Sequence, residues 1–195
     1  MLSMRTCLLV AMVGLTWVGV SEAQRPKLYT APETFSSDLQ GQSGKSAVLS
    51  KIVVRIEKYT LEQDRKAILD ALTTGGYPKF LQTLRATPVV GYVEIEKQRF
   101  NLRFAREKAT AKGRDITLVT ETPVYFLGGG RADAKPRAGY EIAVVTLSVD
   151  DYGLGTGRMA AAAKVKPDGS GGVILDDYAT EPIRLPVVTR AKTKP

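Results

Sequence analysis

The residue types that most enzymes use for catalysis are scarce in this chain. The sequence contains no histidine, and its single cysteine and single tryptophan, Cys7 and Trp17, lie within the first 20 residues. A nucleophile activated by a histidine cannot form, and the imidazole ligands that zinc and haem sites commonly use are missing. Hydroxyls, carboxylates and cations remain, so the composition favours a non-enzymatic protein without a cofactor and without a metal.

Neighbouring carboxylates are the next candidates for chemistry. They occur in three pairs, Glu94 and Glu96, Asp150 and Asp151, and Asp176 and Asp177. A glycosidase needs two carboxylates held about 5 to 9.5 Å apart across a substrate, and adjacency in the sequence does not supply that geometry. The first pair lies beside a basic strand and the second in a turn, so we interpret both as structural. A carboxylate-based hydrolase stays open as an alternative.

Cations dominate one stretch of the chain. Between Lys97 and Arg114 the sequence has seven cations and one acid, Glu107. In an extended strand, Phe100, Leu102 and Phe104 would point to one side and Arg99 and Arg103 to the other, because side chains alternate. The stretch therefore predicts a hairpin with a cationic outer face, which attracts phosphates, anionic lipid or acidic polysaccharide. The alternative is an edge hairpin that its charges keep soluble.

Two groups of residues are our candidates for binding an anion. The first group follows this predicted strand, and the second follows the glycine run 128–130, where free amides and cations could hold an anion. The candidates are Arg99, Arg103, Arg106 and Lys108 in the first group and Arg131, Lys135 and Arg137 in the second.

The first residues have the pattern of an export signal. Arg5 precedes an apolar run from Leu8 to Val20, and Ser21 and Ala23 occupy the two small positions of a cleavage site. The run is too short to cross a membrane. We expect cleavage before Gln24, a location in the periplasm or outside the cell, and no membrane-spanning segment afterwards.

The elements that must position these residues begin after an N-terminal tail. We expect the tail over 24–44, with a short first strand near Phe35 and Leu39, then a single β-rich domain over 45–190 and a C-terminal tail over 191–195. Apolar residues alternate over 46–59, which predicts a strand with one buried face.

A helical hairpin is expected after this first long strand. Thr60 and Gln63 have the spacing of a capping box, and apolar residues then recur at helical spacing. Gly75 and Gly76 would end the first helix, and Pro78 suits the first turn of a second one.

Short strands follow to the end of the chain, separated by Gly, Pro and Asp. We predict them over 89–96, 98–106, 114–121, 124–127, 140–149, 154–166, 173–178 and 183–189. Four consecutive alanines, 160–163, favour a helix, but the segment between Gly157 and Pro167 is too short for one, so we predict a strand whose small side chains admit a close neighbour. The fold class is α+β, mainly antiparallel, with a barrel or sandwich.

Several motifs in this order resemble a family of exported bacterial proteins of unknown function. They are Arg55–Thr60, Ala71–Gly76, Thr87–Tyr92, Arg103–Arg106, Phe126–Arg131, Lys135–Tyr140 and Asp177–Pro182. The resemblance covers the whole expected mature domain. It implies a single exported domain, and it brings no activity, ligand or site residue.

The leading hypothesis from the sequence is a non-enzymatic exported protein that binds an anionic surface or partner at the cell envelope. Nucleic acid is not expected as a partner, because the aromatic side chains point to the core and the protein leaves the cytoplasm. A carrier is the second hypothesis, because a barrel can enclose a small apolar ligand. Its lining would include Val93, Ile95, Phe100, Phe104, Ile142 and Val144.

Overall fold

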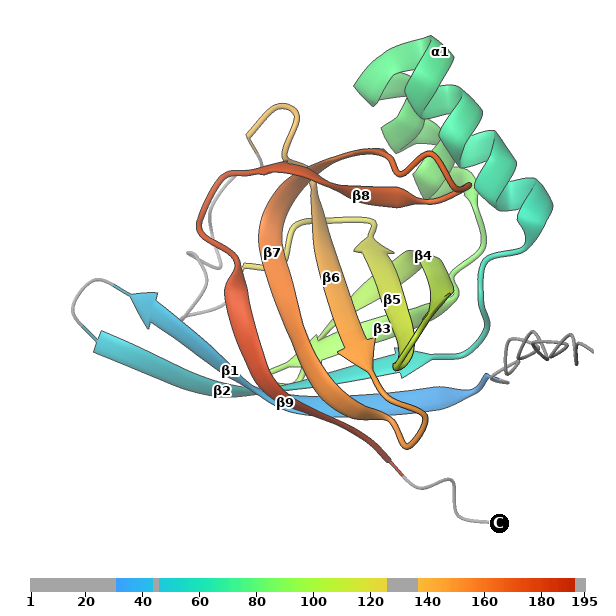
Figure 1. The fold of residues 1–195 in the computed structure, drawn as a ribbon. Helices are drawn as coiled ribbons and strands as arrows, with labels where there is room; N and C mark the ends of the chain where they lie inside the picture. The colour runs from blue at the N-terminus through green and yellow to red at the C-terminus, as the bar shows by residue number, and fades with distance from the viewer. Residues whose placement is uncertain (1–30, 44–45, 126–136, 192–195) are drawn as a thin grey trace, which may run out of the picture.

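Antiparallel strands close into an eight-stranded barrel in the computed structural model of the chain (Figure 1). The structure describes residues 31–43, 46–125 and 137–191, with the backbone alone for 41–43 and 46–49. The strands are β1 (Glu33–Ser43), β2 (Ser46–Ile56), β3 (Gly91–Ile95), β4 (Gln98–Thr110), β5 (Gly113–Thr120), β6 (Ile142–Val149), β7 (Leu154–Pro167), β8 (Val173–Tyr178) and β9 (Ile183–Arg190), and the helical segment is α1 (Glu62–Ala86). The sequence prediction of a mainly antiparallel fold is confirmed. Of the two predicted architectures, barrel and sandwich, the structure has the barrel.

The barrel order is β6-β5-β4-β3-β2-β1-β9-β7, and the pairing of β6 with β7 closes the ring. One edge of β7 serves two partners, since its first half pairs with β9 and its second half with β8. Strand β8 therefore lies outside the ring. At one end of the barrel the first and last strands meet, where the Ala191 amide donates to the Thr34 carbonyl at 2.8 Å.

The strand predicted near Phe35 and Leu39 is eleven residues long and is part of the barrel wall. It pairs with β2 along its whole length, from Glu33 opposite Ile56 to Ser43 opposite Ser46. The pairing of β1 with β9 ends at Gln40, so the far part of the β1–β2 hairpin extends beyond the neighbouring strands (Figure 1).

The barrel encloses one apolar cluster, built by alternation along the strands. Its buried members come from every strand of the ring, for example Ile52 and Val54 of β2 and Val145 and Leu147 of β6. Because each strand turns every second side chain inward, the period of two in the sequence places these residues inside.

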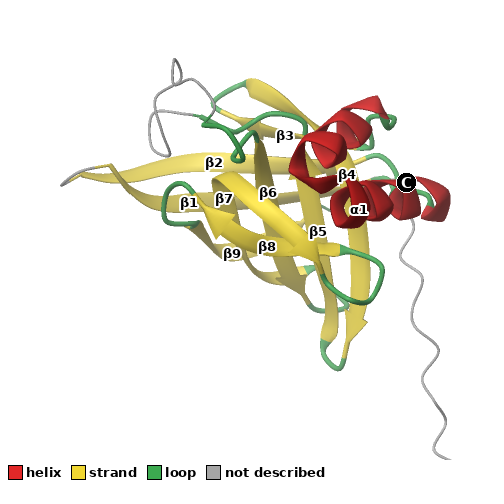
Figure 2. Ribbon diagram, turned by 90° about the horizontal axis from the view of Figure 1, so that it is seen from above, coloured by secondary structure: helices red, strands yellow, loops and turns green. Residues whose placement is uncertain are grey.

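A second apolar cluster lies between the barrel wall and α1, which covers one side of the barrel (Figure 2). Ile68, Phe80 and Leu84 of α1 are fully buried against outward-facing residues such as Val144 and Ala163. Strand β6 is therefore apolar on both faces. Burial of each large side chain stabilises the contact by about 1.5–3 kcal/mol.

The helical hairpin is found, although it follows two strands rather than one. Gly76 interrupts α1 with φ 70° and ψ −175°, and Pro78 lies just after this kink. The predicted capping box is wrong. Leu61 is the N-cap and makes no side-chain cap, because the Thr60 hydroxyl accepts a hydrogen bond from the Ala105 amide of β4 at 2.8 Å. Thr60 thus ties the start of the helix to the barrel.

The four alanines lie in β7, as predicted, and all four are buried. Ala160 and Ala163 belong to the cluster under α1, so their small side chains allow the helical segment to approach the wall. Of the strand predicted over 124–127, residues 124 and 125 are not in a strand and 126 and 127 lie outside the described residues.

Within the part of the chain that the structure describes, none of the helical segments combines the length and apolarity that a membrane span requires.

Candidate functional site

The predicted cationic hairpin is present, but each of the three candidate arginines on β4 has a carboxylate partner. Arg99 donates to Glu94 at 2.6 Å, Arg103 to Glu121 at 2.6 Å, and Arg106 to an aspartate at 2.7 Å. These partners neutralise most of the charge that the sequence places on the outer face of β4.

Arg106 has a structural task in addition. Its guanidinium bonds Asp168 and the Ser170 carbonyl in the turn between β7 and β8. The Asp168 carboxylate also accepts from the amides of Ser170 and Gly172. Burial raises the pKa of Asp168, but the hydrogen bonds from Ser170 and Gly172, with Arg106 beside them, hold it well below its usual value. This arrangement fixes the turn to the barrel wall.

A bulge changes the faces of β4. The pairing of β4 with β5 shifts between Leu102 and Phe104. Leu102 therefore lies inside the barrel, whereas Phe104 lies outside under α1. The expectation that both point to one side is wrong at Phe104, because a bulge inserts one extra residue and reverses the alternation.

The remaining predicted cations lie in different parts of the chain, and two of them are outside the described residues. Lys108 is exposed near the end of β4. The guanidinium carbon of Arg137 lies 5.0 Å from the centroid of the Tyr140 ring, and the Lys164 ammonium lies 4.6 Å from it. Arg131 and Lys135 lie outside the described residues. Of the second group of candidates, the structure therefore describes Arg137 alone.

The paired carboxylates of the sequence take separate partners. Glu94 pairs with Arg99, and Glu96 accepts from the Ser50 hydroxyl at 2.8 Å. Asp150 accepts from two amides of its own turn, Asp176 pairs with Lys166, and Asp177 accepts from Tyr140 at 2.5 Å. Among the residues that the structure describes, His, Cys, Asp and Glu form no group of three or more suited to a metal ion.

The expected lining of a ligand cavity is only partly inside the barrel. Val93 and Ile95 belong to the interior cluster, and Phe100 packs against it. Phe104, Ile142 and Val144 instead lie on the outer face under α1, which corrects that expectation.

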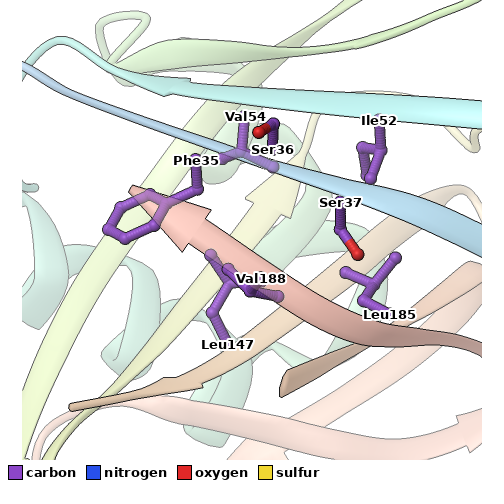
Figure 3. A pocket seen from close by; sticks show the side chains of 8 residues that line it. All are labelled: Phe35, Ser36, Ser37, Ile52, Val54, Leu147, Leu185 and Val188. Carbon is purple, nitrogen blue, oxygen red and sulfur yellow. The ribbon is translucent and has the colours of Figure 1, made fainter. Parts of the chain in front are cut away.

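A small pocket inside the wall lies between β1, β2, β6 and β9 (Figure 3). It is lined by Phe35, Ser36, Ser37, Ile52, Val54, Leu147, Leu185 and Val188. The space between these atoms is about 150 Å³, and none of it is wide enough for a water-sized sphere. A ligand could enter here only if the side chains moved apart.

An ion-pair cluster, which the sequence analysis missed, occupies the end of the barrel where β1 begins and β9 ends. Arg114 of β5 points inward, and its side chain is 1% exposed. It donates to Glu33 through both terminal nitrogens, at 3.0 and 2.5 Å, and to Glu107 at 2.6 Å. Tyr59 donates to Glu33 at 2.7 Å, and Arg190 reaches the same carboxylate at 3.2 Å. We call these five residues the Arg114 cluster.

Electrostatics fix the protonation of the Arg114 cluster. Burial would raise the pKa of Glu33, but the hydrogen bonds from Arg114 and Tyr59 outweigh it and hold the pKa below its usual value. Burial and the bond to Glu33 raise the pKa of Tyr59 well above its usual value. Glu33 is thus a carboxylate and Tyr59 a phenol at neutral pH. Neither is suited to proton transfer, so the cluster acts as a lock between β1, β4, β5 and β9.

A second feature that the sequence analysis missed is a pair of arginines on the outer face of the barrel, on β7 and β9. Arg158 and Arg184 are register partners on these strands, and both are exposed. Within the described residues, neither has a carboxylate within ion-pair distance. Like charges opposite each other destabilise a sheet, so the arrangement is unfavourable unless an anion lies between the guanidinium groups. The signal in the sequence is weak, because the two arginines come together only through the register of β7 with β9.

Comparisons of the chain with models of protein families, with curated proteins and with solved structures find no match.

Proposed function

We propose that this chain is an exported, non-enzymatic protein that binds an anionic component of the cell envelope through the outer face of β7 and β9. The pair of Arg158 and Arg184 carries the proposal, because two exposed arginines are direct register partners across the ladder and have no carboxylate partner among the described residues. Guanidinium groups bind phosphate, sulfate and carboxylate through charge-assisted hydrogen bonds.

The surroundings of the pair supply further donors. Thr146 of β6 is the register partner of Arg158, and Gln40 of β1 is the register partner of Arg184. The four residues form one row across four neighbouring strands. A hydroxyl and an amide thus flank the guanidinium groups, and the net charge of +8 adds a long-range attraction for anions.

The arginines of β4 support the same function less directly. Arg99 is 62% exposed but already bonds Glu94, and an incoming anion would have to compete with that carboxylate. We therefore assign the first contact to Arg158 and Arg184, and a secondary one to the β4 candidates Arg99, Arg103 and Lys108.

Salt-gradient elution from a sulfated polysaccharide column tests this proposal. The double variant R158Q/R184Q should bind the polymer about tenfold more weakly and elute at lower salt, because it loses charge-assisted hydrogen bonds. The control K66Q/K79Q removes the same charge from exposed positions of α1. If both double variants elute at the same salt concentration, binding reflects net charge alone and the proposed site is wrong.

A further inference from the structure

Exposed apolar side chains lie on the same two strands as the arginine pair and in the turn that precedes β7. Tyr152 is 82% exposed, Val187 is 64% exposed and Leu154 is 52% exposed. Large apolar side chains exposed together on a soluble domain are typical of an interaction surface. We refer to these three residues together with Arg158 and Arg184 as the β7–β9 patch.

The strand register brings Leu154, Arg158 and Arg184 onto one face. Leu154 and Arg158 are separated by an even number of positions along β7, so both side chains point outward. Leu154 lies opposite Thr189 and Arg158 opposite Arg184, and Val187 falls between these two rows. At about 3.3 Å per residue the patch extends about 13 Å along β7, from an apolar end to a cationic end.

The turn that carries Tyr152 is held in place. One oxygen of the Asp150 carboxylate accepts from the amides of Tyr152 and Leu154, each at 2.9 Å. The Arg190 amide donates to the Gly153 carbonyl at 2.9 Å, which joins the turn to β9. The tyrosine ring is therefore presented to solvent by a turn with its own hydrogen bonds.

Two exposed acids lie close in sequence or register to members of the patch. Asp151 adjoins Tyr152 in the turn, and Asp38 is exposed on β1. Asp38 lies opposite the exposed Lys51 in the register of β1 with β2, which balances it. The cationic end of the patch keeps its two arginines free of such a partner among the described residues.

We infer that the β7–β9 patch docks on a bilayer surface that contains anionic lipid. This inference rests on the proposed function and names its partner. Tyrosine and aliphatic side chains favour the interface between headgroups and acyl chains, and arginines beside them bind headgroup phosphates. A soluble anionic polymer would use the arginines and leave the apolar end exposed.

Vesicle sedimentation distinguishes the two partners. The protein for this experiment is the chain from Gln24 onward, which contains every residue of the barrel. It should sediment with vesicles of phosphatidylcholine and phosphatidylglycerol, and far less with phosphatidylcholine alone. The variant Y152S/L154S should bind the anionic vesicles about a hundredfold more weakly, since each of the two lost apolar contacts is worth about a factor of ten, and elute unchanged from the polysaccharide column. The control L61S/V89S removes exposed apolar residues elsewhere and should change neither measurement.

A fluorescence probe gives an independent readout. The chain from Gln24 onward has no tryptophan, so Y152W introduces the only one. Its emission should shift to shorter wavelength with anionic vesicles and stay unchanged with the polysaccharide. Polymer binding by the parent chain without vesicle binding overturns this inference and leaves the proposed function standing. If the parent chain binds neither, both fail.

Discussion

Replacing Arg114 by methionine is the sharpest test of how the barrel is held together. The guanidinium is buried and makes hydrogen bonds to Glu33, Glu107 and Tyr59. Methionine keeps most of the apolar stem but removes the charge. Glu33, whose side chain is 5% exposed, is then left with Tyr59 and Arg190 alone.

The expected size of the effect follows from this burial. Removing one partner of a buried ion pair costs about 3–5 kcal/mol, because the remaining charge stays out of water. In a domain of this size each kcal/mol lowers the melting temperature by about 2–4 °C. R114M should therefore melt about 6–20 °C below the parent chain.

Equilibrium unfolding in urea, followed by circular dichroism, measures this change directly. The midpoint should fall with an unchanged slope, since the same surface is exposed on unfolding. The double variant E33Q/R114M should recover part of the loss, because the amide introduced by E33Q carries no charge that needs compensation. The control R99M removes an ion pair at the surface and should leave the midpoint where it is. A midpoint of R114M equal to that of the parent chain would refute the reasoning.

Three further predictions concern acid pH, alkaline pH and packing. The pKa values of Glu33 and Asp168 in the folded chain lie below their usual values. The stabilisation that these carboxylates give is therefore present above the unfolded pKa values of 4.5 and 3.8 and is lost as the pH falls through the folded values. Urea midpoints measured between about pH 6 and pH 2 should decline, and E33Q should flatten the decline. Tyr59 and Tyr77 have raised pKa values, so stability should fall again as the pH rises above 10; a Y59F variant that keeps the full alkaline loss would contradict the role of Tyr59. The variant A163L should lower the free energy of unfolding by about 1–3 kcal/mol, because α1 leaves no space for the larger side chain. The control A109L, at an exposed position of β4, should not lower it. Equal urea midpoints for the two variants would argue against close packing between Ala163 and α1.

The sequence predicts the elements of this fold better than their contacts. Alternation over 46–59 and the apolar run of β6 carry enough information to place strands, because burial imposes a period of two. The turn glycines separate most of the later strands, and β8 begins and ends at the predicted residues. Gly76 marks the kink of α1 because it adopts a positive φ there.

The contacts depend on register, which one sequence does not contain. The bulge in β4 reverses the face of Phe104, and no local pattern announces it. Thr60 has the spacing of a cap, yet its hydroxyl bonds β4 instead. Glu33 and Arg114 are far apart in the chain and meet only because β1 and β5 share the barrel interior. The pair of Arg158 and Arg184 likewise follows from the pairing of β7 with β9.

The position of β9 has a consequence for how the chain acquires this structure. As the last strand in the sequence, it fills the gap between β1 and β7, and its pairing completes the ring. During synthesis β9 is made after the other eight strands of the described sheet, so the sheet stays open until then. Strands β1 and β7 meanwhile offer unpaired edges that other chains can join. A stop codon just before Ile183 would make that interval permanent and give an aggregation-prone product.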